Sequence, residues 1–349
     1  MDYLKGKGAQ INVPNKYSAL SLSTDSLDGL DEELMLEKPR TEIFHETPKK
    51  IISTNSSPDI GPSASINPYQ GCEHGCVYCY ARNSHEYWGF SAGLDFETKI
   101  IVKPEAPQLL EREFLRPSWK PRTIMLSGNT DCYQPLEKKF GITRQLLQVF
   151  NKYQNPVGII TKNALVTRDL DILKELAKSS LVHVIFSITS LDEKLRQKLE
   201  PRTASAVKKL KAMEALAENG IPVGVMNAPI IPGLNHYETP EILRLSADAG
   251  ARFASYTVVR LNGQIGKIFK DWLTKSYPDR ADKVWNQIQE LHGGNVSDSE
   301  FGRRIKGEGN IAEIIRKLFE VSKRKYFKNR EMPPLETSHF RSGGSYSLF

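Results

Sequence analysis

Short apolar stretches alternate with amphipathic stretches along residues 63 to about 260. The six apolar stretches are SASIN (63–67), RTIML (122–126), VGIIT (157–161), LVHVIFSI (181–188), PVGVMNAPII (222–231) and RFASYTVV (252–259). Continuous apolar strands need cover on both faces, so the alternation predicts an α/β fold, with helices covering a parallel sheet. Six strands suit a partial (β/α)6 barrel better than a closed eight-stranded barrel, which usually needs a longer chain.

Four amphipathic stretches predict helices between these strands, at residues 142–153, 167–179, 203–220 and 237–250. In the third helix, helical spacing predicts one apolar face, formed by Val207, Leu210, Met213 and Ala217. Thr203 or Ser205 can cap its start, and Gly220 can end it in the left-handed conformation.

The pattern divides the chain into three parts. Residues 1–62 are polar and rich in turn residues, and predict a largely irregular N-terminal arm. Residues 63–262 form the predicted barrel. Residues 263–349 predict a C-terminal helical extension with a basic tail, and residues 341–349 predict a loose end.

Composition and charge limit where the protein is expected to be located and what it is expected to bind. No apolar run approaches 18 residues, and the N-terminus lacks the apolar core of a secretory signal, so we expect a cytoplasmic protein without a membrane span. Four cysteines in 349 residues do not make a disulfide framework. The net charge is +7, and residues 303–330 hold ten Lys or Arg against three acids. This region is either a solvated surface or a nucleic-acid contact.

Three of the four cysteines, Cys72, Cys76 and Cys79, lie within eight residues in a C-x3-C-x2-C pattern. The loop follows the first predicted strand, at the carboxyl edge where such folds place their chemistry. A structural zinc site would need a fourth ligand, for which His74 or His85 is available. The alternative interpretation of the three cysteines is a 4Fe-4S cluster held by three thiolates, which leaves one iron open for a small molecule.

The segment CEHGCVYC resembles the signature of radical S-adenosylmethionine (SAM) enzymes, C-x3-C-x-aromatic-C. Beyond the signature, the chain resembles the spore photoproduct lyase-like branch of that superfamily, and within it an uncharacterised bacterial subgroup. The similarity runs in order through the segments CVYCYAR, NTDCYQPLE, IITKN, VIFSITS, LEPRTAS and GIPVGVMNAPIIPG.

The resemblance implies a partial six-stranded barrel and a reaction. Cys72, Cys76 and Cys79 would hold a 4Fe-4S cluster, and SAM would bind the fourth iron. Reductive cleavage of SAM would give a 5′-deoxyadenosyl radical that abstracts hydrogen from the substrate. The resemblance also implies an electron donor such as flavodoxin or ferredoxin. Tyr78 and Tyr80, on either side of the third cysteine, would relay a hydrogen atom in this branch, or only pack against the loop.

The resemblance also implies SAM contacts at several strand ends. Thr130 and Asp131 follow the second strand, Lys162 ends the third, Ser187 lies in the fourth and Asn227 in the fifth. A Lys or Ser within such apolar runs would cost several kcal/mol if buried without a partner, which independently favours a polar ligand there.

The hydrogen-donating cysteine of the lyase branch has no direct counterpart. Gly128 stands at the matching position, and Cys132 lies four residues later on the same loop. Cys132 is either a shifted donor or a buried structural thiol. Arg202 either pairs with Glu200 or lines the substrate site.

Three functions remain open from the sequence. The first is a radical SAM enzyme that repairs or modifies nucleic acid, with the basic C-terminal region as a contact. The second is a radical SAM enzyme with a protein, lipid or small-molecule substrate. The third is a zinc-stabilised nucleic-acid binding module without catalysis.

Overall fold

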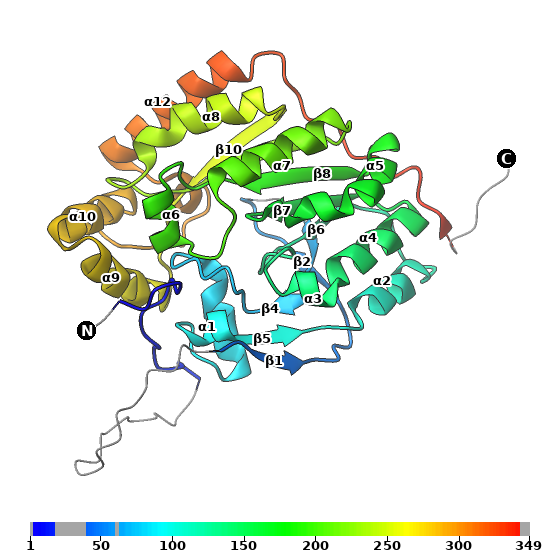
Figure 1. Ribbon diagram of the computed structural model, residues 1–349, viewed down its shortest axis with the longest axis horizontal. Helices are drawn as coiled ribbons and strands as arrows, with labels where there is room; N and C mark the ends of the chain where they lie inside the picture. The colour runs from blue at the N-terminus through cyan, green and yellow to red at the C-terminus, as the bar shows by residue number, and fades with distance from the viewer. Residues whose placement is uncertain (1–2, 18–39, 60–62, 343–349) are drawn as a thin grey trace, which may run out of the picture.

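The computed structural model describes residues 3–17, 40–59 and 63–342 (Figure 1). Its main sheet contains six parallel strands, in the order of the chain: β3 (Ser63–Ile66), β6 (Ile124–Leu126), β7 (Val157–Thr161), β8 (Val182–Ser187), β9 (Val223–Ile230) and β10 (Phe253–Val258). Each pairs in parallel with the next. The α/β class and all six predicted strands are confirmed.

Helices connect these strands and cover the sheet. The longer ones are α2 (Ala106–Phe114), α4 (Ile142–Tyr153), α5 (Leu170–Lys178), α7 (Ala206–Glu218) and α8 (Thr239–Asp248). Short helical turns lie between them: η1 (Tyr80–Trp88), α1 (Asp95–Thr98), α3 (Glu137–Phe140), η2 (Ala164–Asp169), α6 (Glu193–Leu199) and η3 (His236–Glu238). The four predicted helices correspond to α4, α5, α7 and α8.

The predicted apolar face of α7 is confirmed only in part. Met213 is fully buried as predicted, but Val207 is exposed, and Lys209, which was not predicted on that face, is fully buried. Ser205 caps the helix by accepting a hydrogen bond from the Lys208 amide, as predicted. This orientation of α7 matters for the site, because it buries Lys209 among apolar residues.

Four strands were not predicted. β2 (Ile52–Asn55) pairs with β3 in antiparallel orientation at one edge of the main sheet. A separate sheet contains β1 (Glu42–His45), β5 (Lys99–Val102) and β4 (Tyr69–Gln70), in that order. The described part of the N-terminal arm is therefore irregular over residues 3–17 but contributes β1 and β2.

The predicted C-terminal extension is helical. It contains α9 (Ile265–Ser276), η4 (Pro278–Arg280), α10 (Ala281–Leu291), α11 (Arg303–Lys306) and α12 (Gly309–Tyr326). Figure 1 shows α12 alongside α8, on the outside of the sheet. Of the predicted loose end, residues 343–349 lie outside the described residues. Among the described residues, the structure contains no helix that is long and apolar enough to cross a membrane.

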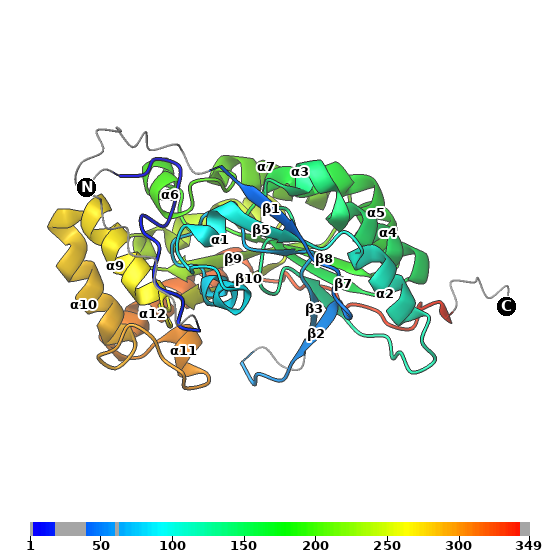
Figure 2. The same ribbon diagram turned by 90° about the horizontal axis from the view of Figure 1, so that it is seen from below.

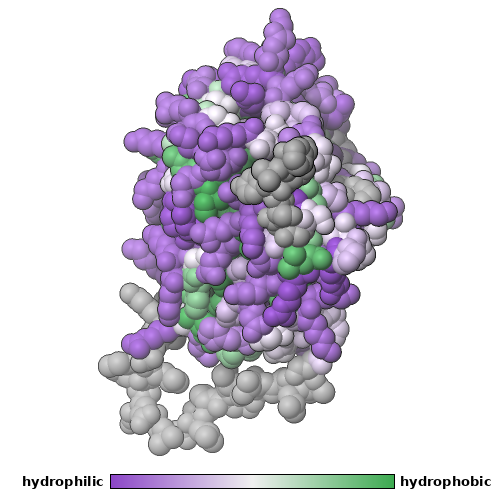
Figure 3. Space-filling model, turned by 90° about the vertical axis from the view of Figure 1, so that its right-hand side faces the viewer, coloured by the Kyte–Doolittle hydropathy of each residue, from purple (hydrophilic) through white to green (hydrophobic). Residues whose placement is uncertain are grey.

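Residues 330–341 run along the amino-terminal edge of the main sheet. The Arg330 guanidinium donates to the carbonyl of Ala251, just before β10, at 3.1 Å. The Glu336 amide donates to the carbonyl of Ser180, just before β8. Figure 3 views this side of the molecule, where hydrophilic residues cover most of the surface and small hydrophobic areas lie between them.

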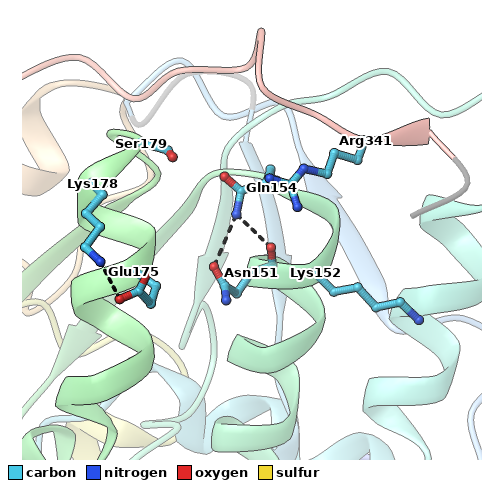
Figure 4. A pocket seen from close by; sticks show the side chains of 7 residues that line it. All are labelled: Asn151, Lys152, Gln154, Glu175, Lys178, Ser179 and Arg341. Atoms are coloured by element: carbon cyan, nitrogen blue, oxygen red, sulfur yellow. Dashed lines mark hydrogen bonds and ion pairs between the residues drawn. The ribbon is translucent and has the colours of Figure 1, made fainter. Parts of the chain in front are cut away.

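A polar cavity of about 290 Å³ opens at the same edge (Figure 4). Some of the polar groups that line the cavity pair with one another, as Lys178 does with Glu175. Its lining residues are Asn151, Lys152, Gln154, Glu175, Lys178, Ser179 and Arg341. It contains none of the predicted site residues, which gather at the opposite, carboxyl edge.

Candidate active site

The cysteine loop connects β4 to η1 at the carboxyl edge of the sheet. Cys72 and Cys76 are buried, Cys79 is partly buried, and all three are free thiols. The Cys72 amide donates to the carbonyl of Phe96 at 2.8 Å, which fixes the start of the loop. Gly75 adopts a φ of +69°, which favours glycine and lets the backbone curl between the first and second cysteines of the motif.

The chemistry of these donors suits an iron–sulfur cluster. Burial, and next the charge of Asp131, raise the pKa of Cys72, and the neighbouring thiols Cys76 and Cys79 raise it further. Buried thiols that repel one another as thiolates become favourable ligands once metal ions share their charge. The loop therefore brings three soft ligands close together, and a bound metal would offset the cost of deprotonating them.

The geometry does not support the hypothesis of a structural zinc site. No three His, Cys, Asp or Glu side chains among the described residues are placed to hold one metal ion together. A 4Fe-4S cluster does not need such convergence, because each thiolate binds a different iron. His74 has its two ring nitrogens 3.4 Å from Asp131 and 3.2 Å from Asn163. His85 is packed between Phe90 and Phe96.

Lys162 and Ser187, predicted from adjacent strands, meet at the carboxyl edge. The Lys162 ammonium donates to Ser187 Oγ at 2.8 Å and to Thr189 Oγ1 at 2.9 Å. It also lies 3.3 Å from the carboxylate of Glu200, and the ring of Tyr78 faces it at 5.5 Å. These contacts give the partly buried ammonium a counter-charge and fix its position at the strand ends.

Glu200 and Lys209 are site residues that the sequence reasoning missed. Glu200 is fully buried and accepts hydrogen bonds from Tyr78 and Thr189. Lys209, also fully buried, lies 3.3 Å from Glu200. Burial alone would raise the pKa of Glu200, but Lys162, Lys209 and the Tyr78 hydroxyl together hold it well below its usual range. The carboxylate therefore stays ionised between two ammonium groups.

Arg202 does not pair with Glu200. Its guanidinium lies 3.2 Å from Glu73, which follows the first cysteine of the motif, and it is partly exposed. No sequence signal identifies the true partners of Glu200, because Lys209 is seen to be buried beside Ala206 and Met213 only in the folded structure.

Asp131 and Thr130 organise the loop after β6. Asp131 accepts hydrogen bonds from the Lys162 amide at 2.7 Å and from Thr161 Oγ1 at 2.9 Å. Thr130 Oγ1 donates to the carbonyl of Tyr69 at 2.9 Å. Asp131 thus links the loop after β6 to the end of β7 and positions Lys162. A direct contact of either residue with SAM stays a prediction.

Asn227 is fully buried in β9, and both ends of its amide have protein partners. Its Nδ2 donates to the carbonyl of Ile188 at 3.1 Å, and its Oδ1 accepts from Thr239 Oγ1 at 2.9 Å. These contacts give Asn227 a role in joining β9 to the end of β8 and the start of α8. Its predicted contact with SAM is not tested by this arrangement.

The two tyrosines of the loop have different surroundings. Tyr78 is buried and its hydroxyl is held by Glu200. Tyr80 is 55% exposed, and its hydroxyl donates to the carbonyl of Gly128. The predicted relay residue Tyr80 therefore reaches Gly128, the position that the resemblance matches to the donor cysteine of the lyase branch.

Cys132 lies in the main hydrophobic core and is fully buried. Its amide donates to Ser127 Oγ at 2.8 Å, and its carbonyl accepts from Thr143 Oγ1. Burial raises the pKa of the Cys132 thiol well above its usual range. The structure therefore buries the Cys132 thiol, while its role as a hydrogen donor stays a prediction.

The N-terminal segment covers the outer side of the cysteine loop. Glu97 accepts hydrogen bonds from the amides of Gly8, at 3.1 Å, and Ala9, at 2.7 Å, and forms a buried ion pair with Arg82 at 2.6 Å. A Cβ atom on Gly8 would stand 1.6 Å from the carbonyl oxygen of Gly75, so only glycine fits. Figure 2 shows this segment, in dark blue, running beside α9.

Comparisons with known proteins agree with this geometry. The sequence profile of the Radical SAM superfamily matches residues 66–246, more than half of the chain. An uncharacterised protein of Mycobacterium tuberculosis (strain ATCC 25618 / H37Rv), Rv2578c, is 33% identical over 217 residues, covering 62% of this chain. This chain spans 64% of the length of that relative. The uncharacterised protein MJ0683 of Methanocaldococcus jannaschii is 29% identical over 248 residues, covering 71% of this chain and 88% of the relative.

Solved structures of spore photoproduct lyase share the fold. The enzyme complexed with dinucleoside spore photoproduct has a TM-score of 0.59 at 15% identity, covering 82% of this chain and 80% of that chain. A mutant of the same enzyme has a TM-score of 0.62 at 14% identity, covering 90% and 89%. At this level of identity, the similarity concerns the fold alone.

Proposed function

The chain belongs to the radical SAM superfamily and is an enzyme of that type, and on this premise we propose that Cys72, Cys76 and Cys79 hold a 4Fe-4S cluster that binds SAM. The observation that carries the proposal is the loop of three free thiols at the carboxyl edge, beside the partly buried Lys162. A reduced cluster bound there would supply the electron for cleaving SAM to methionine and a hydrogen-abstracting 5′-deoxyadenosyl radical.

The polar groups around Lys162 are proposed to receive SAM. Its ammonium and the Ser187 hydroxyl are suited to the carboxylate of the ligand, with Glu200 as the counter-charge that keeps the lysine protonated and in place. Asp131 supports this arrangement through the Lys162 amide. Solved structures of spore photoproduct lyase include one with bound AdoMet, which supports SAM as the ligand of this fold.

The two tyrosines are proposed to have separate roles. Tyr80, exposed beside Gly128, is placed to pass a hydrogen atom toward the substrate. Tyr78, whose hydroxyl is held by Glu200, is placed to orient that carboxylate beside Lys162. Cys132 would act as a donor only after leaving the core, so we assign the first of these roles to Tyr80.

Nucleic acid is the substrate class that we propose, for repair or modification. Two observations support it: a solved neighbour is complexed with a dinucleoside photoproduct, and residues 303–330 are strongly basic. The structure separates the two ends of that basic region. Arg304 lies within electrostatic range of Arg260, which follows the end of β10, whereas Arg330 lies at the amino edge, away from the cysteine loop.

A protein or small-molecule substrate is the second candidate. It is favoured by Gly128, which stands where the resemblance places the donor cysteine of the lyase branch. Photoproduct reversal needs that donor, so the glycine favours a different radical reaction.

SAM cleavage with and without nucleic acid tests the proposal. Anaerobically prepared protein would receive SAM and reduced flavodoxin or ferredoxin, and 5′-deoxyadenosine would be measured. Cleavage that single-stranded or duplex DNA or RNA stimulates would support the first candidate. Cleavage that nucleic acid does not change would favour the second, and absence of cleavage with an intact cluster would count against both.

A further inference from the structure

Arg260 stands on a rigid loop at the carboxyl edge, two residues after β10. The carbonyl of Val259 is held at 2.7 Å by the ring of His292. The carbonyl of Asn262 accepts from Asn83 Nδ2 at 2.9 Å, which ties the loop to η1. The backbone on both sides of Arg260 is therefore fixed relative to the cysteine loop.

The Arg260 side chain lies within electrostatic range of Tyr80. Tyr80 in turn reaches from η1 to the carbonyl of Gly128, at the end of β6. The loops after β6 and β10 and the helical turn after the cysteines thus meet at one place. This place is the exposed side of the proposed active site, since Tyr80 is its exposed tyrosine.

The guanidinium of Arg260 has no hydrogen bond or ion pair within the part of the chain that the structure describes. The acids that act on it, Asp59 and Asp298, are already paired, with Arg304 and Arg303 respectively. Burial, and next the charge of Arg304, lower the pKa of Arg260. A partly buried cation without a partner is unfavourable, and an anionic ligand would remove that cost.

We propose that Arg260 binds a phosphate group of a nucleic-acid substrate, with the exposed ring of Tyr80 beside it for contact with a base or sugar. The guanidinium is a planar fork that matches phosphate oxygens. Single-stranded nucleic acid is commonly held by cationic groups next to exposed aromatic rings. The inference rests on the proposed function and assigns substrate binding to the end of β10.

The test measures binding of a fluorescein-labelled twelve-nucleotide oligothymidylate by anisotropy, with the full-length, anaerobically prepared protein at 50 to 200 mM salt. Arg260→Gln should weaken binding about ten-fold and reduce the log–log salt slope by about 0.7, the value for one phosphate contact on a single strand. Arg260→Lys should keep most of the salt slope but lose part of the affinity, because it retains the charge and loses the fork. Arg116→Gln, at the opposite edge, is the control and should bind like the wild type.

Three outcomes separate the inference from the function on which it rests. Loss of affinity in Arg260→Gln, with an unchanged circular dichroism spectrum, supports the inference. Wild-type affinity and slope in Arg260→Gln, with weaker binding in Arg324→Gln, overturn it in favour of the basic end of α12. Absence of binding by the wild type at 50 mM salt overturns both the inference and the nucleic-acid substrate, while SAM cleavage remains a separate test of the enzyme.

Discussion

Glu200 and Lys209 form a fully buried ion pair, with 3.3 Å between Oε1 and Nζ. The other carboxylate oxygen, Oε2, faces Lys162 at the same distance. This carboxylate therefore serves two lysines from different elements, one on α7 and one at the end of β7. The pair links the packing of α7 against the main sheet to the proposed SAM site.

Replacing Glu200 by Gln should strongly destabilise the protein. The substitution leaves the buried ammonium group of Lys209 and the partly buried one of Lys162 without a counter-charge, and breaking a buried pair typically costs about 3–5 kcal/mol. Denaturant unfolding measures the free energy. Glu241→Gln, which breaks an exposed pair with Arg244, is the control and should have little effect. Equal stability of the two variants would contradict the account of the buried pair.

Replacing Lys162 by Met should weaken SAM binding about ten-fold or more, because a charge-assisted hydrogen bond to the ligand is lost. Equilibrium dialysis with labelled SAM measures the affinity, and iron content shows that the cluster is retained. Lys174→Met, on the exposed face of α5, should bind SAM like the wild type. Unchanged affinity in Lys162→Met would remove Lys162 from the proposed site.

Replacing Gly8 by Ala should displace the N-terminal segment from the cysteine loop. The added Cβ would stand 1.6 Å from the carbonyl oxygen of Gly75, which is backbone and cannot give way cheaply. Limited proteolysis should then cut residues 3–17 faster, and the cluster should be lost sooner in air. Gly266→Ala is the control, since its Cβ would keep 3.3 Å from its nearest neighbour. Equal proteolysis of both variants would contradict the packing of this segment.

Stability should decrease as the pH falls from 6.5 to 4, in part because of His85. Burial lowers the pKa of His85 to about 4, partly offset by Asp95. In that interval the unfolded chain takes up a proton at this residue that the folded chain does not, at a cost of up to about 3 kcal/mol. Thermal unfolding should show a smaller pH dependence in His85→Leu, with His183 and His292 still present. Parallel curves for variant and wild type would contradict the assignment.

The fold could be predicted from the sequence where burial is complete. The six parallel strands are covered on both faces, so each is a continuous apolar run with a clear signal. β1 and β2 were missed because they are short and mostly exposed, and β5 because it belongs to a second, small sheet. Helical periodicity alone placed part of the apolar face of α7 wrongly. The spacing admits Val207 as readily as Lys209, but the structure exposes Val207 and buries Lys209.

The site was predictable where a polar residue interrupts an apolar strand end. Lys162 and Ser187 were chosen on that ground, and the structure brings them within 2.8 Å. The partners that stabilise them were not predictable. Glu200 follows a short helix and Lys209 looks like a surface lysine in the sequence, and only the packing of α7 against the sheet brings them together.

The central claim is that Cys72, Cys76 and Cys79 hold a 4Fe-4S cluster, and iron and sulfide content of anaerobically prepared protein tests it most directly. Wild type and Cys132→Ala should each contain about four irons and four sulfides per chain, with a broad absorption band near ~400 nm, and Cys76→Ala should lose them. One zinc without sulfide in the wild type, or an intact cluster in Cys76→Ala, would contradict the account.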